Sequence, residues 1–230
     1  MLSTTSPRET STALVDSPEI IYPSSDGAPL AETQEHVWAI LITLNLLSQY
    51  LSQQQAVVFA NPFLYYIPGN PRARVAPDIM VVFDIPPGLR SHYKIWEEGQ
   101  TPAVIFEMTS ASTQSHDREF KRTLYEQLGI QEYWLFDPHA DWIPEQLQGY
   151  HLNEEGIYKP IPERHSQVLQ LRIEPQGHCL DFYRLDTGEK LLTPAELLVS
   201  VEQERHRAEE EHQRAERLAI KLRELGITAL

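Results

Sequence analysis

Cysteine is almost absent from this sequence of 230 residues, which contains Cys179 alone. A single thiol forms no disulfide within the chain and excludes zinc sites built from several cysteines. The sequence also lacks an apolar run of the about 20 residues that a membrane-spanning helix requires. Its first residues show neither the basic stretch nor the apolar stretch of a secretory signal. These absences predict a cytoplasmic protein that does not enter a membrane.

Positive charge is scarce. The 19 Lys and Arg residues stand against 33 Asp and Glu residues, which gives a formal net charge of −14. A protein that coats nucleic acid needs Lys and Arg to neutralise phosphates, so the net charge argues against that class. An enzyme with a local basic cleft and bound metal ions is not excluded. A small basic group, Arg72, Arg74, Arg90 and Lys94, surrounds a predicted strand at 79–83.

Several familiar catalytic motifs are missing as well. The sequence contains no HExxH, no G-x-S-x-G and no glycine-rich phosphate-binding loop. His206 and His212 are six residues apart in a predicted helix, so their side chains do not face each other. Cys179 has no candidate base beside it and is expected to be a structural thiol. The sequence therefore favours neither a zinc protease nor a hydrolase with a serine or cysteine nucleophile.

The remaining composition, 41% hydrophobic and 23% charged, is typical of a globular protein. Residues 1–30 are rich in Ser, Thr and Pro, which predicts a mobile arm. A helix follows, with Thr33 as a plausible N-cap. Apolar residues recur in it at helical spacing, and most of them are expected to face the core: Val37, Ile40, Leu41, Leu44, Leu47 and Leu51.

Short apolar runs predict strands at 56–60, 64–67, 79–83, 103–108 and 132–136. Asn61-Pro62, between the first two runs, indicates a hairpin or a bend. The run at 103–108 is continuous apart from one acid near its end, as in a strand buried on both faces. A helix at 116–128, ended by Gly129, precedes the last run. This order predicts an α/β core with a mixed sheet flanked by helices.

The last third of the chain predicts two hairpins, one formed by 148–151 with 157–161 and the other by 169–173 with 180–183. They are expected to extend the core with antiparallel strands. A long charged helix then opens at Thr193-Pro194-Ala195-Glu196 and runs to about 225. The predicted division is therefore an arm (1–30), a domain (31–195) and a charged helical tail (196–230).

The tail carries a weak heptad seam. Its positions are Val201, Glu204, Ala208, Glu211, Ala215, Leu218, Leu222 and Leu225. Two of these positions are glutamates, which weakens the seam at its start. A coiled coil and a solvated, salt-bridged single helix therefore both remain open.

Two acids at the edges of predicted strands, Asp78 and Glu107, suggest chemistry. A pair of carboxylates can hold Mg²⁺ or Mn²⁺ for phosphodiester hydrolysis, because hard oxygen ligands suit these ions and the ion activates water. The backbone carbonyl of Met108 can supply a further ligand. Lys121, on the helix after the Glu107 strand, is the candidate cation that offsets charge on the phosphate. Asp117, Lys121 and Tyr125 share one face of that helix at i, i+4 and i+8.

Each residue also has a plain structural explanation. Asp78 after a proline is often a turn residue or a strand cap. Asp117 and Lys121 have the spacing of an ordinary helix ion pair, with a net value of about 0.3–0.5 kcal/mol. Tyr125 is more often a packing aromatic. Singly, none of these residues identifies a site.

The combined order resembles one family. The relevant residues are Pro77-Asp78, Glu107-Met108-Thr109-Ser110, Ser112-Thr113, Asp117, Lys121, Tyr125, Gly129 and Glu132-Tyr133-Trp134. This pattern resembles the bacterial Uma family of restriction endonucleases, within the PD-(D/E)XK nuclease superfamily. The resemblance extends to the segments 22–27 and 91–98, the strand-rich segment that ends at 186–189, and the Arg-Ala-Glu tail. It covers most of the chain from about residue 22.

The resemblance implies a restriction-endonuclease-like fold in which Asp78 and Glu107 bind metal and Lys121 is the catalytic cation. In that family the lysine usually lies on the following helix, so Thr109 in the strand is no sign of a damaged site. An acid of the first helix sometimes completes such sites, and Glu32 and Glu35 are the candidates. The implied function is Mg²⁺- or Mn²⁺-dependent cleavage of DNA, with a homodimer plausible. The alternative is an inactive module that oligomerises or recruits partners through its C-terminal helix.

Overall fold

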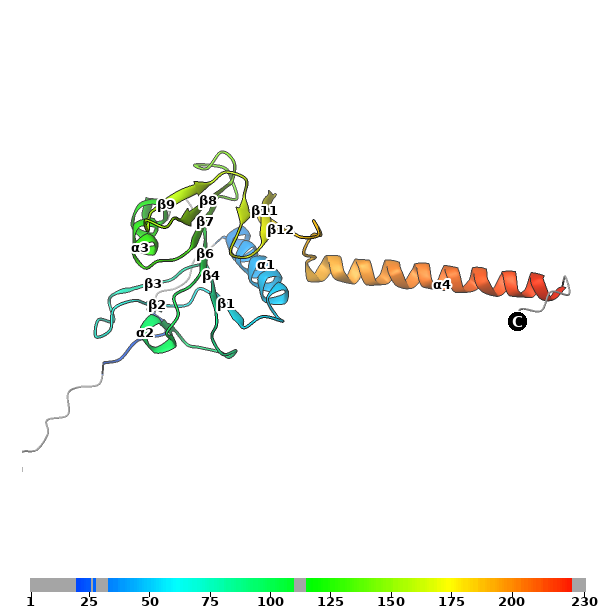
Figure 1. Ribbon diagram of the computed structural model, residues 1–230, viewed down its shortest axis with the longest axis horizontal. Coiled ribbons are helices and arrows are strands. Elements are labelled where there is room, and N and C mark those ends of the chain that lie inside the picture. Colours follow the sequence, from blue (N-terminus) through cyan, green and yellow to red (C-terminus); the bar gives the residue numbers. More distant parts are fainter. Residues whose placement is uncertain (1–19, 26, 28–32, 110–114, 225–230) are drawn as a thin grey trace, which may run out of the picture.

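The computed structural model describes residues 20–25, 27, 33–109 and 115–224. A six-stranded mixed sheet forms its centre, in the order β1-β4-β6-β7-β8-β9 (Figure 1). The strands are β1 (Ala56–Ala60), β4 (Ile79–Phe83), β6 (Val104–Met108), β7 (Glu132–Phe136), β8 (Leu147–Leu152) and β9 (Tyr158–Ile161). Within this sheet β6 and β7 pair in parallel, and every other neighbouring pair is antiparallel. The predicted mixed α/β fold is confirmed.

Two small sheets and the helices surround this sheet. One small sheet contains β10 (His165–Ser166), β11 (Leu171–Gln176) and β12 (Cys179–Arg184); the other contains β2 (Leu64–Tyr65), β3 (Arg74–Val75) and β5 (Tyr93–Lys94). The helices are α1 (Gln34–Tyr50), α2 (Ile95–Glu98), η1 (His116–Lys121), α3 (Arg122–Gln127) and α4 (Pro194–Glu224). In Figure 1, α1, β11 and β12 lie on one side of the central sheet and α3 lies on the other.

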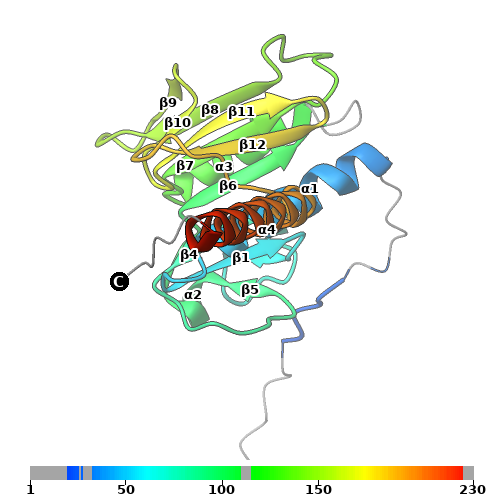
Figure 2. The same cartoon turned by 90° about the vertical axis from the view of Figure 1, so that its right-hand side faces the viewer.

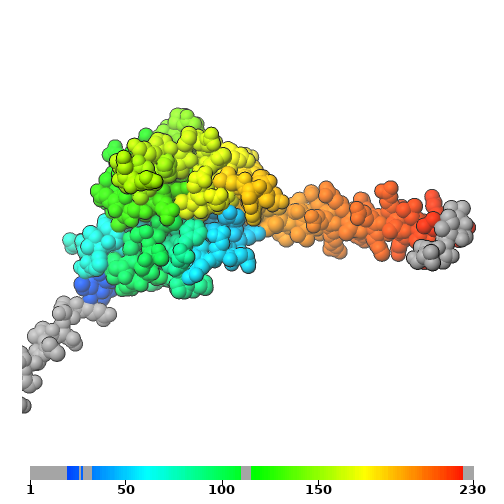
Figure 3. Space-filling model, in the orientation of Figure 1, coloured from blue at the N-terminus to red at the C-terminus, as the bar shows by residue number. Residues whose placement is uncertain are grey.

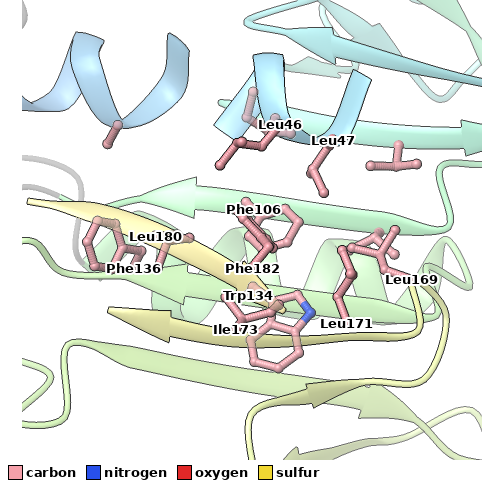
Figure 4. Close-up of a cluster of buried hydrophobic side chains, with 14 of the residues drawn as sticks. Leu46, Leu47, Phe106, Trp134, Phe136, Leu169, Leu171, Ile173, Leu180 and Phe182 are labelled. Atoms are coloured by element: carbon pink, nitrogen blue, oxygen red, sulfur yellow. The ribbon is translucent and has the colours of Figure 1, made fainter. Parts of the chain in front are cut away.

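The two faces of the central sheet bury separate hydrophobic clusters. On one face, Phe106 and Trp134 pack against Leu46 and Leu47 of α1 and Phe182 of β12 (Figure 4). On the other face, the neighbouring strand residues Ile105, Tyr133 and Leu135 join Leu124 and Tyr125 of α3. The alternation of side chains along each strand produces this division, because successive residues point to opposite faces.

The predicted buried face of α1 needs a correction. Ile40, Leu47 and Leu51 are buried as expected, but Val37 is 39% exposed and Leu41 is 47% exposed. Ala39, Thr43 and Leu46 take their places in the interior. The stripe that faces the protein is therefore rotated relative to the prediction, because α1 is covered both by the central sheet and by β12. Thr33 does cap the helix, since its side chain accepts a hydrogen bond from the His36 N–H.

The predicted helix at 116–128 begins as a π-helix, η1, and continues as α3. The Arg122 N–H donates to the carbonyl of Asp117, five residues earlier. Single π-turns are rare in proteins and often occur at functional sites. Gly129, with φ +77°, follows the helix as expected.

The strands of the last third form both predicted hairpins, but only one of them extends the central sheet. β8 and β9 continue that sheet, whereas β11 and β12 belong to a separate sheet that packs against α1. Nor do the first two predicted strands form a hairpin. β1 pairs with β4, and β2 pairs with β3 and β5, so Asn61-Pro62 forms a bend.

Part of the predicted arm contacts the folded domain. The Tyr22 ring lies 5.0 Å from that of Tyr65 and 5.5 Å from that of Trp96, measured between ring centroids. The Tyr22 hydroxyl accepts a hydrogen bond from the Gly69 N–H, and the Tyr65 hydroxyl donates to the carbonyl of Pro23. Residues 20–25 are thus attached to the sheet of β2, while 1–19 lie outside the described residues.

The long helix α4 starts where the sequence predicts, and the structure shows a capping box there. The Thr193 side chain accepts from the Glu196 N–H, and the Glu196 carboxylate accepts from the Thr193 N–H. Lys190 reaches the same carboxylate and lowers the pKa of Glu196 to about 2. None of the helices in the described part of the chain is both long and apolar enough to cross a membrane.

Substitution of Gly149 is expected to destabilise the protein. A Cβ at this position would lie 2.4 Å from the ring of Trp134, which is fully buried and stacked on Phe106. Gly149→Ala should therefore lower the free energy of unfolding by about 1–3 kcal/mol, the usual effect of overpacking. Urea denaturation measures it, with exposed His151 on the same strand as the control (His151→Ala). Equal stability of Gly149→Ala and wild type would contradict this packing.

Candidate functional site

The centre of the site is Glu107, near the end of β6. Strand alternation places Phe106 and Met108 in the cluster beneath α1, so Glu107 points to the opposite face, toward η1 and α3. Because β6 lies between β4 and β7, the Glu107 side chain is completely buried, with 0% exposure. A carboxylate in this position requires polar partners, since an unpaired buried charge is strongly unfavourable.

Two residues of the following helix supply those partners. The Lys121 ammonium donates to Glu107 Oε2 over 2.8 Å, and the Tyr125 hydroxyl donates to Oε1 over 2.7 Å. Asp117 lies beside them, with its Oδ1 3.0 Å from Lys121 Nζ. The structure thus brings together four residues that the sequence analysis singled out. The first and last of them, Glu107 and Tyr125, are 18 positions apart in the chain.

The environment changes how these groups titrate. Burial raises the pKa of Glu107 to about 8, although the Lys121 charge opposes the increase. Burial alone would lower the pKa of Lys121, but the carboxylates of Glu107 and Asp117 raise it above its ordinary value. The pKa of Tyr125 is raised well above its ordinary value by burial and by Glu107. Lys121 therefore keeps its positive charge, and Tyr125 remains a hydrogen-bond donor.

Asp78 reaches the site from the start of β4. The pairing of β4 with β6 ends at Ile79 and Phe106, and the Asp78 carboxylate continues it by accepting the Met108 N–H through Oδ2 over 2.6 Å. The N–H and C=O of one strand residue point to the same edge. The Met108 carbonyl therefore faces the Asp78 side of β6.

These groups form a donor set that suits a hard divalent cation. Asp78, Glu107 and the Met108 carbonyl offer oxygen ligands, and the Asp78 charge is close enough to raise the pKa of Glu107. The buried Asp117 Oδ1 accepts no hydrogen bond despite its short distance to Lys121. The carboxyl groups of Asp78, Glu107 and Asp117 thus share Lys121 as a nearby cation. No group of three or more His, Cys, Asp or Glu within 33–109 and 115–224 has the arrangement of a metal site. Mg²⁺ nevertheless commonly uses only one or two carboxylates, with water for the rest.

Thr109, two residues after Glu107, has a structural role. Its hydroxyl accepts a hydrogen bond from Trp142 Nε1 over 3.0 Å, and its N–H donates to the Phe136 carbonyl. The side chain is buried. A lysine at this position would lose the Trp142 contact, whereas Lys121 reaches Glu107 from the helix.

The first helix contributes a residue that the sequence did not single out. His36 of α1 places Nε2 at 3.7 Å from Asp78 Oδ1, and its side chain is 13% exposed. Glu35, one of the two predicted acids, is exposed, and Glu32 lies outside the described residues. The helical phase would have identified His36, because it shares one face with the buried Ile40, Thr43 and Leu47 at intervals of four, three and four residues.

The basic residues around β4 are largely engaged with other groups. Arg90 pairs with Glu98 at 2.6 Å and Lys94 pairs with Glu97 at 3.0 Å, so neither carries an unopposed charge. Arg74 lies over the ring of Phe63, with 4.6 Å from its guanidinium carbon to the ring centroid. These contacts leave Lys121 as the principal cation at the carboxylates.

Comparison with known protein families identifies one family. The model of the family Uma2, described as "Putative restriction endonuclease", matches residues 10–182. Among solved structures, the chain is similar to a protein from Anabaena variabilis ATCC 29413 described as "a putative nuclease belonging to DUF820". The two share 17% sequence identity over 61% of this chain and 73% of that chain, with a TM-score of 0.44. No curated protein matches the chain.

Removal of the Lys121 charge is expected to destabilise the protein in a pH-dependent way. In Lys121→Met, the ionised fraction of Glu107 and the Asp117 carboxylate lose their cation, so the free energy of unfolding should fall by about 3 kcal/mol at pH 8. The loss should be smaller at pH 5, because Glu107, whose pKa burial raises, is then protonated. Urea denaturation in a chelator measures both values.

The double variant Lys121→Met/Glu107→Gln is the control, since it removes the buried charge together with its partner. Its stability at pH 8 should exceed that of Lys121→Met. An equal loss at both pH values in the single variant would show that packing, and not the charge pair, is responsible.

Proposed function

This chain belongs to the Uma2 family of restriction-endonuclease-like proteins, and we propose that it hydrolyses phosphodiester bonds of DNA with Mg²⁺ or Mn²⁺. Family membership supports a nuclease as the general class. The observation that carries the finer proposal is the convergence of Glu107, Lys121 and Asp78 from three separate segments on one end of β6.

Each residue of the site has a role in this proposal. Asp78, Glu107 and the Met108 carbonyl hold the divalent ion, which when bound activates water and stabilises charge on the leaving oxygen. Lys121 offsets negative charge on the phosphate and helps to position the attacking water. Tyr125 fixes the orientation of Glu107 through its hydrogen bond, and Asp117 holds Lys121 in place.

The proposal extends to the organisation of the chain. Residues 31–195 form the catalytic domain, residues 20–25 pack against it, and 196–230 are a tail, with the protein acting in the cytoplasm as a homodimer. The rival function is an interaction module that keeps the nuclease fold without its chemistry. One observation favours that rival: α4 has no buried residue, although it runs for 31 residues. Cleavage of DNA separates the two possibilities.

Mn²⁺ binding is expected to depend on the two carboxylates. Calorimetric titration of wild type should give one site per chain, and the Asp78→Asn/Glu107→Gln variant should show no binding there, because both charged ligands are gone. Asp84→Asn is the matched control, since Asp84 is exposed and follows the other end of β4. Equal binding in the double variant and wild type would refute the site.

Cleavage is then measured on plasmid DNA with Mn²⁺. Lys121→Ala, which keeps Asp78 and Glu107, should reduce the rate by about 100-fold or more, as loss of a group that stabilises developing charge typically does. Wild type that binds Mn²⁺ at these carboxylates but cuts neither duplex nor single-stranded DNA would favour the interaction module.

We infer that His36 is a positioning residue for Asp78. Its imidazole lies beside Asp78 Oδ1, the oxygen that does not hold the Met108 N–H. Residues that orient a metal ligand typically contribute 10- to 100-fold to affinity. His36→Ala should therefore weaken Mn²⁺ binding by about 10-fold or more. Gln34→Ala, at an exposed position of the same helix, is the control. An unchanged dissociation constant in His36→Ala would remove His36 from the site.

A further inference from the structure

The helix α4 projects from the domain as a rod. Figures 1 and 3 show it extending away from the other elements. It contains 31 residues, none of them buried, and every side chain from 201 to 224 is exposed. At 1.5 Å per residue its length is about 46 Å. Figure 2, which looks along this helix, shows it leaving the face where α1 lies.

Ion pairs within α4 do not explain how this exposed helix is stable without packing against the domain. Between residues 194 and 224, the pairs that form are His206–Glu210 at 3.7 Å and His212–Glu216 at 3.6 Å. Both depend on protonated histidine, and all four side chains are at least 66% exposed. Such pairs contribute little to stability. A salt-bridged single helix, one of the two possibilities left open by the sequence, is therefore poorly supported.

The heptad seam supplies a better explanation. With Val201 at an a position, the a and d positions from one end of α4 to the other are Leu197, Val201, Glu204, Ala208, Glu211, Ala215, Leu218 and Leu222. Val201 is 63% exposed, Leu218 is 53% exposed and Leu222 is 40% exposed. This seam has apolar residues at both ends and Glu and Ala between them. A helix that binds it must place neither a negative charge nor a large apolar side chain opposite the glutamates.

A parallel, in-register pair of two such helices does not meet that requirement. Parallel pairing places identical d residues opposite each other. Glu204 would then face Glu204 of a second copy, and Glu211 would face its own counterpart. Like charges held in the seam repel each other, so this arrangement is unfavourable.

An antiparallel pair removes both conflicts. If the helices cross about a two-fold axis between residues 209 and 210, each a position faces a d position of the second copy. Leu197 then lies opposite Leu222, and Val201 lies opposite Leu218. Towards the middle, Glu204 faces Ala215 and Ala208 faces Glu211. Every glutamate of the seam therefore meets a small alanine.

The residues beside the seam favour the same orientation. Arg214 precedes Ala215, and Arg207 precedes Ala208. In the antiparallel arrangement Arg214 of one copy lies beside Glu204 of the other, and Arg207 lies beside Glu211. The two-fold axis repeats both pairs. Each seam glutamate thus has an opposite charge next to it.

We propose that α4 is a self-association surface that binds the α4 helix of a second copy of this chain in an antiparallel coiled coil. In this arrangement each seam position from Leu197 to Leu222 faces a compatible residue of the second copy. Its two-fold symmetry limits the assembly to two chains. It does not depend on nuclease activity.

The first test measures mass in solution. Light scattering coupled to size-exclusion chromatography should give the full chain twice the monomer mass. Leu218→Glu should give a monomer, because the charge enters the apolar layer with Val201. Ile220→Glu is the matched control: Ile220 is 54% exposed, close to the 53% of Leu218, but lies on the opposite side of the helix. It should remain dimeric. A monomeric wild type, or equal masses for the two variants, would overturn the proposal.

The second test measures orientation by disulfide cross-linking in a Cys179→Ser background. Antiparallel pairing places residue 201 of one copy opposite 218 of the other and about 25 Å from residue 201 of the other, 17 residues away along the helix. A mixture of Val201→Cys and Leu218→Cys chains should therefore form a mixed dimer, and Val201→Cys alone should not cross-link. Cross-linking of Val201→Cys to itself would establish a parallel pair and refute the proposed orientation.

Discussion

The burial of the Glu107 carboxylate in the central strand is the constraint that shapes the site. A charge enclosed by β4 and β7 is unfavourable by several kcal/mol unless donors reach it. The parallel connection from β6 to β7 supplies them, because a crossover between parallel strands carries a helix over one face of the sheet. That helix brings Lys121 and Tyr125 onto both carboxylate oxygens. The sheet order and the position of Lys121, the proposed catalytic cation, therefore have the same physical origin.

Asp78 shows why a structural and a functional explanation need not exclude each other. Its Oδ2 completes the strand pairing by accepting the Met108 N–H, which is the role of a strand cap. The same contact fixes the direction of the carboxylate and leaves Oδ1 on the side of His36. The hydrogen bond that ends the ladder thus also orients a proposed metal ligand. A single residue of this kind looks ordinary in the sequence.

The strands and the position of Glu107 could be predicted from the sequence, because the patterns that indicate them lie within short stretches of the chain. The continuous apolar run before Glu107 predicts a strand buried on both faces, and the i, i+4, i+8 spacing predicts that Asp117, Lys121 and Tyr125 share a side. The phase of α1 is less accessible, since Leu46 is buried by β12, a strand far along the chain. His36 lies on the face that the structure buries, which Ile40 and Leu47 of the predicted stripe share. The π-turn of η1 could not be predicted, because the spacing used to recognise helices assumes 3.6 residues per turn.

The length of α4 has a consequence for what an assembled pair could reach. Each domain is attached at the first residue of its helix, so antiparallel pairing puts the two domains at opposite ends of a rod about 46 Å long. Along a straight duplex that distance corresponds to about 14 base pairs at 3.4 Å per step. The two sites would stand more than a full helical turn of DNA apart. Such a spacer suits two independent incisions, or contact with two separate duplexes, better than a joint cut across one position.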